Sequence, residues 1–484
     1  MNAYVLTSLV DRRPGVGASP RAHGAAMSMF LKWAFDRFAE KSPVTVMTRA
    51  LMEHAFDTKA LDALFGEHAE RQWEKKLLFS SLVDLMSLVV CRVEPSVKKA
   101  YMAMKDTLPV SLTAVYSKLN GMEEAVIAEM VRYMASRLAP VIEAMGGQLP
   151  SLIPGYQTMI IDGNHLASTD HRLAVLRLCK AAPLPGHALV ILNPDLRLAV
   201  DMIPCEDAHA QERSLFSKVL SMVKRMQCWI GDRNFCTAGF LQGIIVRGAY
   251  FIIRQHANLR IDSYGTLRSQ GRCSNGAVFE QTVTIPGEDG QPITLRRIVL
   301  KLDVPTREGN TEIVILTNLP TKAANAARIA ELYHERWTIE RLFHTLTQIL
   351  DGEKPSLGYP GAALFNFAVA LVSYNIAATL RAALRAQFGH ERVEADVSWH
   401  YIAHEVRKNS SGMEVTLDET VWTRFQSMSP QELGREILSF AAKVRLDNFP
   451  LQKRGPKKPP PKRTEHADES HVSTARLLEQ AGLH

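Results

Sequence analysis

The stretch from residue 333 to residue 350, YHERWTIERLFHTLTQIL, constrains the fold most strongly because it has helical length and holds neither Pro nor Gly. At about 100° per residue, its polar and aromatic side chains share one sector and its apolar side chains gather on a broadly opposed one. The first sector holds Tyr333, Arg336, Trp337, Glu340, His344 and Thr347, and the second holds Leu332, Ile339, Leu342, Phe343, Leu346, Ile349 and Leu350. We predict a single helix that packs on a core with its apolar side and presents a phenol, a guanidinium, an indole and a carboxylate on the other.

A chain of 484 residues is too long for one simple core, so two or three domains are expected. The 57 Lys and Arg against 50 Asp and Glu give a net charge of +7, which fits a polyanionic partner and an ordinary basic protein equally well. None of the six cysteines forms a CxxC pair, which predicts reduced core thiols rather than a zinc ribbon or a disulfide scaffold. The N-terminus has no apolar segment of signal-peptide length, and the apolar run 77–91 is too short to cross a bilayer, so it predicts a buried helix.

The N-terminal region is predicted to be helical after a disordered start at 1–27. Residues 28–150 have the pattern of a helical domain, which fits DNA binding and dimerisation alike; we expect DNA binding. A Ser-Pro pair at 42–43 marks a helix start. A long helix is expected to kink or restart at Pro140 and to end at Gly146.

From residue 151 strands and helices alternate, so 151–254 is predicted to be the first part of an α/β core. Strands are predicted at 156–165, 171–178, 187–193, 196–203, 228–232 and 250–254, and an amphipathic helix at 208–223. The first of these strands would end on Asp162, where Gly163 turns the chain, and the fifth would end on Asp232.

A β-rich insertion is predicted at 255–310, with antiparallel strands at 279–285 and 293–302. The three remaining segments are predicted to be the second part of the core with the Glu helix, a helical C-terminal region and a basic Pro-rich tail, at 311–355, 356–448 and 449–484. The tail is expected to be a disordered cationic arm. Its role is open between keeping the protein soluble and binding nucleic acid phosphates.

Three acidic residues stand where an α/β core places its chemistry. Asp162 and Asp232 at strand ends would face the crevice in which such sheets bind ligands, and Glu340 lies on the polar sector of its helix. Such carboxylates can hold two divalent cations about 3.5–4 Å apart, which activate an attacking oxygen and stabilise a leaving one in phosphoryl transfer. Many Asp and Glu triples occur in a chain of this length. Asp170 and Asp201 are rivals that rank lower because no turn signal follows them directly.

The order of these three acids along the strands and helices resembles the ribonuclease H-like fold of the DDE transposases. Among these, the insertion-sequence-four family has the motif Y-(2)-R-(3)-E-(6)-K around its Glu. This chain has Tyr333, Arg336 and Glu340 at those spacings, and Thr347 stands where Lys is expected. The segments IIDGNH and IGDRNF also resemble the family's two Asp motifs, and a β-rich insertion between the second Asp and the Glu is a family feature. The resemblance covers about 155–350.

The resemblance implies a DNA transposase that cleaves DNA at transposon ends and transfers the cut strand in cut-and-paste transposition. It assigns catalysis, and the binding of two Mg²⁺ or Mn²⁺ ions per active site, to Asp162, Asp232 and Glu340. It further implies double-stranded DNA as the partner, as terminal inverted repeats and as target. A homodimer in the synaptic complex and a location in the bacterial cytosol, without a membrane, follow from the same resemblance.

Five further residues are predicted to contact DNA. By the resemblance, Tyr333 and Arg336 would contact phosphates near the cleavage point, and an Arg fork suits that task. Trp337 would stack on a base displaced from the duplex or pack against the β-rich insertion. Arg233 would reach a phosphate or pair with a carboxylate, and His344, one turn beyond the Glu, is the candidate to replace the missing Lys.

Two other functions stay open at this point. A ribonuclease H-like nuclease such as a junction resolvase would use similar carboxylates, although the β-rich insertion and the helical N-terminus argue against it. A transposase derivative that binds DNA without cleaving it is the third hypothesis, and Thr347 is its one hint. Strand-joining products would separate the first two, and binding without cleavage in Mn²⁺ would favour the third.

Overall fold

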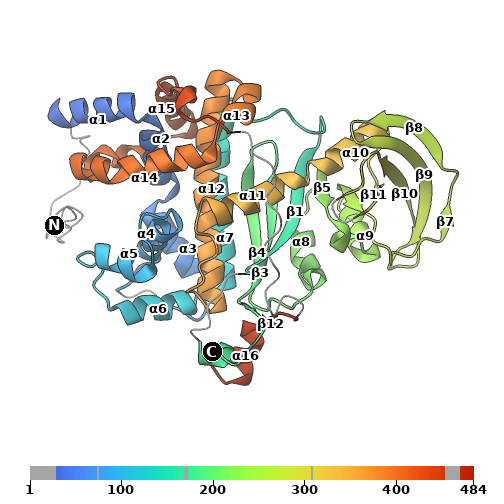
Figure 1. Cartoon of the computed structure of the whole chain (residues 1–484), viewed down its shortest axis with the longest axis horizontal. Coiled ribbons are helices and arrows are strands. Elements are labelled where there is room, and N and C mark those ends of the chain that lie inside the picture. Colours follow the sequence, from blue (N-terminus) through green and yellow to red (C-terminus); the bar gives the residue numbers. More distant parts are fainter. Residues whose placement is uncertain (1–28, 74–75, 168–172, 307–308, 453–468, 484) are drawn as a thin grey trace. The chain divides into compact units, whose positions relative to one another are not determined.

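A mixed α/β architecture is formed by the residues that the computed structural model describes, which are 29–73, 76–167, 173–306, 309–452 and 469–483. The chain divides into two compact units. We call them the helical unit (1–148, 167–183 and 345–472) and the sheet unit (149–166, 184–344 and 473–484). A large sheet accompanied by helical regions is therefore confirmed (Figure 1). The expected disorder at 1–27 concerns residues outside the described ones, and the finer domain bounds stay predictions.

Two groups of helices, from before and after the sheet strands in sequence, build the helical unit. They are α1 (Met29–Lys41), α2 (Pro43–Ala55), α3 (Thr58–His68), α4 (Phe79–Val90), α5 (Val97–Ala103), α6 (Leu112–Asn120), α7 (Glu124–Met145), α12 (Pro360–Phe388), α13 (His390–Asp396), α14 (Trp399–Thr416) and α15 (Pro430–Ala441). Pro43 opens α2, as predicted. Of the predicted kink or restart, the restart does not occur, because α7 is one continuous helix through Pro140. Buried Leu138 and Val141 on both sides of the proline stabilise the helix against the lost hydrogen bond. Gly146 ends α7 with a left-handed φ of +66°, as predicted.

The longest helix, α12, lies along α7 at the centre of the helical unit (Figure 1). It also packs on α2, α4 and α15. By length and composition α12 could cross a membrane, but 89% of its most apolar 18-residue stretch is buried inside the structure. This is the environment of a central bundle helix, and membrane insertion does not follow from it. The predicted buried helix at 77–91 is confirmed as α4.

The sheet unit contains a ten-stranded sheet in the order β4-β3-β1-β5-β6-β11-β10-β9-β7, with β8 paired to β9. The strands are β1 (Gln157–His165), β3 (His187–Asn193), β4 (Leu198–Cys205), β5 (Gln227–Gly231), β6 (Tyr250–Arg254), β7 (Ser263–Tyr264), β8 (Arg268–Cys273), β9 (Gly276–Pro286), β10 (Pro292–Leu302) and β11 (Glu312–Thr317). Strands β1, β3 and β4 are antiparallel neighbours, whereas β5 and β6 run parallel to β1. Alternate side chains of β1, β3, β4, β5 and β6 form one apolar core with side chains of α8 (Phe216–Met222) and α9 (Ala238–Val246). Both helices are labelled in Figure 1.

Two predicted elements differ in the structure. The strand expected at 171–178 is absent from the part described, 173–178, which forms the 3-10 turn η1 (Ala174–Leu176). Of the apolar residues in 173–178, only Leu176 is deeply buried, and Leu178 is exposed. The alternating residues therefore do not pair with a strand of the sheet. The helix expected at 208–223 is confirmed only from Phe216, after the 3-10 turn η2 (Glu212–Leu215).

The end of the chain is ordered where the sequence predicts only a cationic arm. After the basic stretch, which lies outside the described residues, the chain forms β12 (Val472–Ser473) and α16 (Thr474–Gln480). Arg476 and Ser473 both bond the carboxylate of Asp207, at 2.9 and 2.8 Å. This carboxylate anchors α16 within the sheet unit.

The predicted β-rich insertion extends the main sheet. Strands β9 and β10 pair along their full length, as expected for 279–285 and 293–302, and β10 then pairs with β11. Arg296 on β10 forms a two-pronged ion pair with Glu280 on β9, with N–O distances of 2.6 and 3.2 Å. Its remaining amino group donates to the backbone oxygens of Leu319 and Ala324, both at 2.9 Å. One guanidinium thus joins the hairpin to the turn that precedes α10 (Ala326–His334).

Replacing Arg296 with Met should lower the free energy of unfolding by about 2 kcal/mol, because a mostly buried carboxylate and two carbonyl groups lose their charged donor. Arg272→Met is the matched control, since its ion pair with Asp303 is more than half exposed and such pairs contribute little. Urea denaturation of both variants measures the difference. Equal losses in the two variants would contradict the structural role of Arg296.

Candidate active site

The polar helix stretch contains a break in the structure. Helix α10 ends at His334 and α11 (Trp337–Gln348) begins three residues later, so the predicted single helix over 333–350 is wrong in this respect. In the turn, the N–H groups of Thr338 and Ile339 donate to carbonyl oxygens three residues back, at 2.9 and 3.2 Å. Arg336 lies within this turn and aims its side chain at Asp162. Four residues of the predicted apolar sector, Leu332, Ile339, Leu342 and Leu346, are fully buried, which confirms that side of the pattern.

Asp162 and Asp232 lie at equivalent positions along two neighbouring parallel strands, β1 and β5. Ile160 of β1 pairs with Ile230 of β5, and each Asp follows two residues later. Asp232 comes directly after β5, as predicted, and caps the 3-10 turn η3 (Arg233–Phe235) by accepting from the N–H of Asn234 at 2.8 Å. Strand β1 does not end on Asp162 but continues to His165, because it still pairs there with β3.

A single guanidinium holds two of the predicted acids. Arg336 Nη1 lies 2.8 Å from Asp162 Oδ2, and Nη2 lies 2.5 Å from Glu340 Oε1. The side chains of Arg336 and Asp162 are 14% and 17% exposed, whereas that of Glu340 is 49% exposed. Residues far apart in sequence therefore meet around one cation, and the site opens to solvent on the side of Glu340.

The negative charge of this cluster is not fully compensated. Burial raises the pKa of Asp162 from 3.8 to about 7, and the neighbouring Asp232 and Glu212 add to the rise while Arg336 and the N–H of Gly163 oppose it. Burial likewise raises the pKa of the Tyr333 hydroxyl, and Arg336 opposes that shift. A carboxyl group with a pKa near neutrality is one that would gain from a further positive charge.

Glu212 is a fourth carboxylate of the cluster that the sequence analysis missed. It begins η2, its Oε2 accepts from Asn234 Nδ2 at 3.2 Å, and burial together with Asp232 raises its pKa. In the sequence it looks like an ordinary acid on an amphipathic helix. Its place in the connection that follows β4 is the one signal that could have found it.

The other predicted residues lie at the edges of this cluster. Trp337 is 45% exposed, and its ring meets that of His334 edge-on, with 4.2 Å between centroids. Arg233 in η3 and His344 on α11 are exposed. Of the rivals, Asp201 is buried on β4 and Asp170 lies outside the described residues.

The carboxylates suit hard divalent cations by their chemistry, because all the donors are oxygens and carry excess negative charge. Within the ranges that the structure describes, no three His, Cys, Asp or Glu side chains already stand as ligands of one ion. Asp162 and Glu340 do not stand as ligands of one ion because the guanidinium of Arg336 lies between them. The donor set therefore fits divalent cations by its chemistry, while Arg336 bridges two of the three predicted acids.

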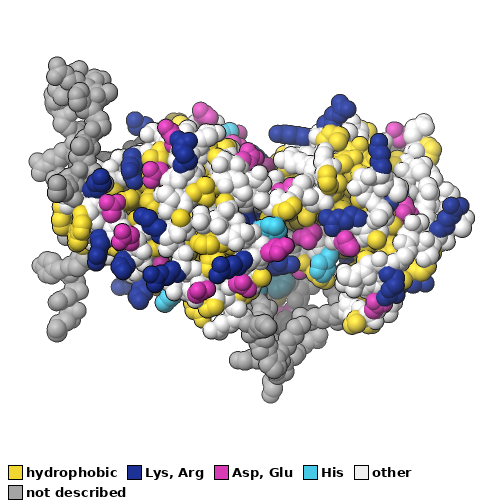
Figure 2. Space-filling view, turned by 90° about the horizontal axis from the view of Figure 1, so that it is seen from above, with side chains coloured by type: hydrophobic (Ala, Val, Ile, Leu, Met, Phe, Trp, Pro, Cys, Tyr) yellow, Lys and Arg dark blue, Asp and Glu magenta, His cyan; other side chains and the backbone are white. Residues whose placement is uncertain are grey.

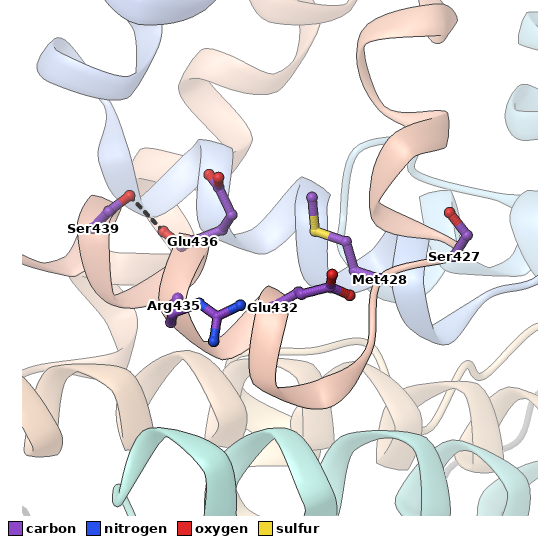
Figure 3. A pocket seen from close by; sticks show the side chains of 6 residues that line it. All are labelled: Ser427, Met428, Glu432, Arg435, Glu436 and Ser439. Carbon is purple, nitrogen blue, oxygen red and sulfur yellow. Dashed lines mark hydrogen bonds between the residues drawn. The ribbon is translucent and has the colours of Figure 1, made fainter. Parts of the chain in front are cut away.

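A surface hollow in the described part of the chain contains none of the predicted site residues. A hollow of about 440 Å³ lies at the start of α15, where Glu432 belongs to the helix cap and Ser439 bonds the Glu436 carbonyl (Figure 3). No predicted site residue lines it. On the face drawn in Figure 2, Lys and Arg side chains are spread out with Asp and Glu among them, so this face carries no single cationic surface.

Comparisons with known proteins point to one class. Residues 187–376 match the family described as "Transposase DDE domain", a range that includes Asp232 and Glu340 and begins after Asp162. The chain is 29% identical over 197 residues to "Putative transposase y4zB" of Sinorhizobium fredii (strain NBRC 101917 / NGR234), covering 37% of this chain and 52% of that protein. This chain thus spans about half the length of that relative.

One solved structure, the cryo-EM structure of the piggyBac transposase synaptic complex with hairpin DNA, is matched over 86% of this chain and 82% of that one. The TM-score of 0.34 and the identity of 10% are too low to support an argument. Both sequence matches are to transposases, and the family matched over residues 187–376 is described as a transposase DDE domain.

Proposed function

We propose that this protein is a DNA transposase of the DDE type and that Asp162, Asp232 and Glu340 are its catalytic carboxylates. The observation that supports this most directly is the bridge formed by Arg336, whose two amino groups bond Asp162 and Glu340 at 2.8 and 2.5 Å. Asp232 lies at the level of Asp162 on the neighbouring strand. The sequence match to the DDE domain over 187–376 supports the same conclusion independently.

The sheet supports a ribonuclease H-like core. Three antiparallel strands, β1, β3 and β4, are followed by a helix, the parallel strand β5, a second helix and the parallel strand β6. Within the DDE class we propose the insertion-sequence-four family. Tyr333, Arg336 and Glu340 keep that family's spacing, and a β-rich insertion separates Asp232 from Glu340.

In this proposal Asp162, Asp232 and Glu340 would hold two Mg²⁺ or Mn²⁺ ions. When bound, such ions activate the attacking oxygen and stabilise the leaving one in phosphoryl transfer. Arg336 exchanges its carboxylate partners for a DNA phosphate, which its planar fork suits, and Tyr333 contacts phosphate beside it. The exposed Trp337 stacks on a base, and the exposed Arg233 and His344 extend the contact along the backbone.

The partners follow from the same proposal. Double-stranded DNA is bound both as transposon ends and as target, and a homodimer brings the two ends together. The helical region at 28–150 and the cationic tail are the proposed sites of further DNA contact. The reaction takes place on chromosomal DNA in the bacterial cytosol.

The proposal is tested with the full-length protein and linear DNA carrying the two genomic flanks of its coding region. We expect cleavage at the element ends in Mg²⁺ or Mn²⁺ and none in EDTA, followed by strand-joined products on gels. Cleavage without joining would favour the nuclease alternative. Binding without cleavage in Mn²⁺ would favour a derivative that no longer catalyses, and full activity of Asp232→Asn would overturn the assignment.

A further inference from the structure

Glu212 contacts both halves of the proposed centre, although neither the family motif nor the sequence match assigns it a role. Its Oε2 accepts from Asn234 Nδ2 at 3.2 Å, and the backbone N–H of Asn234 donates to Asp232 Oδ1 at 2.8 Å. Its Oε1 lies only 2.1 Å from the point where a Cβ atom on residue 163 would stand. The Glu212 carboxylate thus touches the turn of Asp232 on one side and the backbone next to Asp162 on the other.

The elements that carry these contacts are packed against the core of the sheet unit. The rings of Phe216, which follows η2 as the first residue of α8, and Phe235, at the end of η3, stack with 5.4 Å between centroids. Both rings are buried in the core of the sheet unit. Glu212 and Asn234 therefore approach each other from two anchored turns, and their hydrogen bond does not depend on a mobile loop.

Gly163 is explained by the same arrangement. Its N–H donates to Asp162 Oδ1 at 3.0 Å, and its missing side chain leaves the space that the Glu212 carboxylate fills. The obstructing atom is the end of a flexible side chain. An alanine at 163 would therefore displace Glu212 rather than unfold the strand.

We infer that Glu212 is a positioning residue for the carboxylate centre, which fixes Asp232 through Asn234 and holds that turn against the strand of Asp162. This inference rests on the proposed function. Groups that orient metal ligands without touching the metal commonly change metal affinity by about 10- to 100-fold when they are lost. The carboxylate oxygen of Glu212 acts as a hydrogen-bond acceptor, so a neutral side chain with a similar oxygen should replace it.

The test is Mn²⁺ affinity of the full-length protein, measured by calorimetry without DNA. Glu212→Ala and Asn234→Ala should each weaken Mn²⁺ binding by about 10-fold or more. The double variant should bind Mn²⁺ no more weakly than either single variant. Glu212→Gln keeps an acceptor for Asn234 and should stay within about threefold of the native protein. Glu331→Gln is the matched control, since its carboxylate is 41% exposed and pairs with Arg328 away from the cluster.

A second comparison uses Gly163. Gly163→Ala should weaken Mn²⁺ binding in the native background and have little effect in the Glu212→Ala background, because the displaced group is already absent. Thermal unfolding in EDTA checks that each variant is folded.

Three outcomes decide the matter. Unchanged affinity in Glu212→Ala, or equal losses in Glu212→Gln and Glu212→Ala, would overturn the positioning role. If Asp162→Asn and Asp232→Asn also bind Mn²⁺ normally, the proposed function itself fails. If those two variants lose Mn²⁺ binding and Glu212→Ala keeps it, only the inference about Glu212 fails.

Discussion

Asp162→Asn should abolish strand cleavage and, at the same time, make the metal-free protein more stable at pH 8. The loss of cleavage should reach about 10³-fold or more, because a ligand of the proposed ions is removed and each tenfold corresponds to about 1.4 kcal/mol of transition-state stabilisation. The gain in stability has a separate cause. The fold raises the pKa of Asp162 from 3.8 to about 7, mainly by burial. An ionised carboxylate at this position therefore opposes folding.

The sign and the pH window follow from that shift. Below about pH 4 the side chain is protonated in both the folded and the unfolded chain, so Asp162 has no effect on stability. Between about pH 4 and pH 7 only the unfolded chain releases the proton, and stability falls as pH rises. Above that range the loss of folding stability caused by the ionised Asp162 is constant and on the order of 4 kcal/mol. Asn is neutral throughout and should remove the loss.

Denaturation of both proteins in EDTA at pH 4.5 and pH 8 measures this prediction. The variant should gain at pH 8 and differ little at pH 4.5. Added Mg²⁺ should stabilise only the native protein at pH 8. Asp262→Asn is the control, because Asp262 forms an exposed ion pair with Arg260. A variant that is less stable than the native protein at pH 8 would show that the Asp162 carboxylate is not under electrostatic strain.

The approach of Asp162 and Asp232 could be expected from the sequence, because each follows a buried apolar run and parallel strands end at a common edge. The antiparallel strands of the insertion were equally predictable from alternation and turn signals. These features depend on local patterns, which a sequence displays directly.

The break before Trp337 and the role of Glu212 depend on distant partners and could not be predicted in this way. No Pro or Gly marks the turn at 335–336, and Arg336 bonds Asp162 from it across 174 positions of sequence. Glu212 reaches the centre only because η2 places its carboxylate over Gly163. The strand expected at 171–178 also depends on a distant partner. Its residues alternate between apolar and polar, but in the part that the structure describes, 173–178, they form a 3-10 turn and pair with no strand.

The second large effect is expected for Arg336→Ala, which removes the cation shared by Asp162 and Glu340. Without metal, the variant should lose about 3 kcal/mol of stability at pH 8, because a mostly buried carboxylate is left beside Asp232 without its partner. Divalent cations should restore much of this loss. Mn²⁺ should also bind more tightly than to the native protein, since no guanidinium competes for the two carboxylates.

Cleavage should nevertheless fall by about 10²-fold or more in Arg336→Ala, because the proposed phosphate contact is lost. Arg336→Lys should keep part of the stability and little of the cleavage, since an ammonium group lacks the planar fork that reaches two partners. Arg260→Ala, which breaks the exposed pair with Asp262, is the matched control and should change neither property. Equal Mn²⁺ affinity in Arg336→Ala and the native protein would contradict competition between the guanidinium and the ions. Normal cleavage would contradict the phosphate contact.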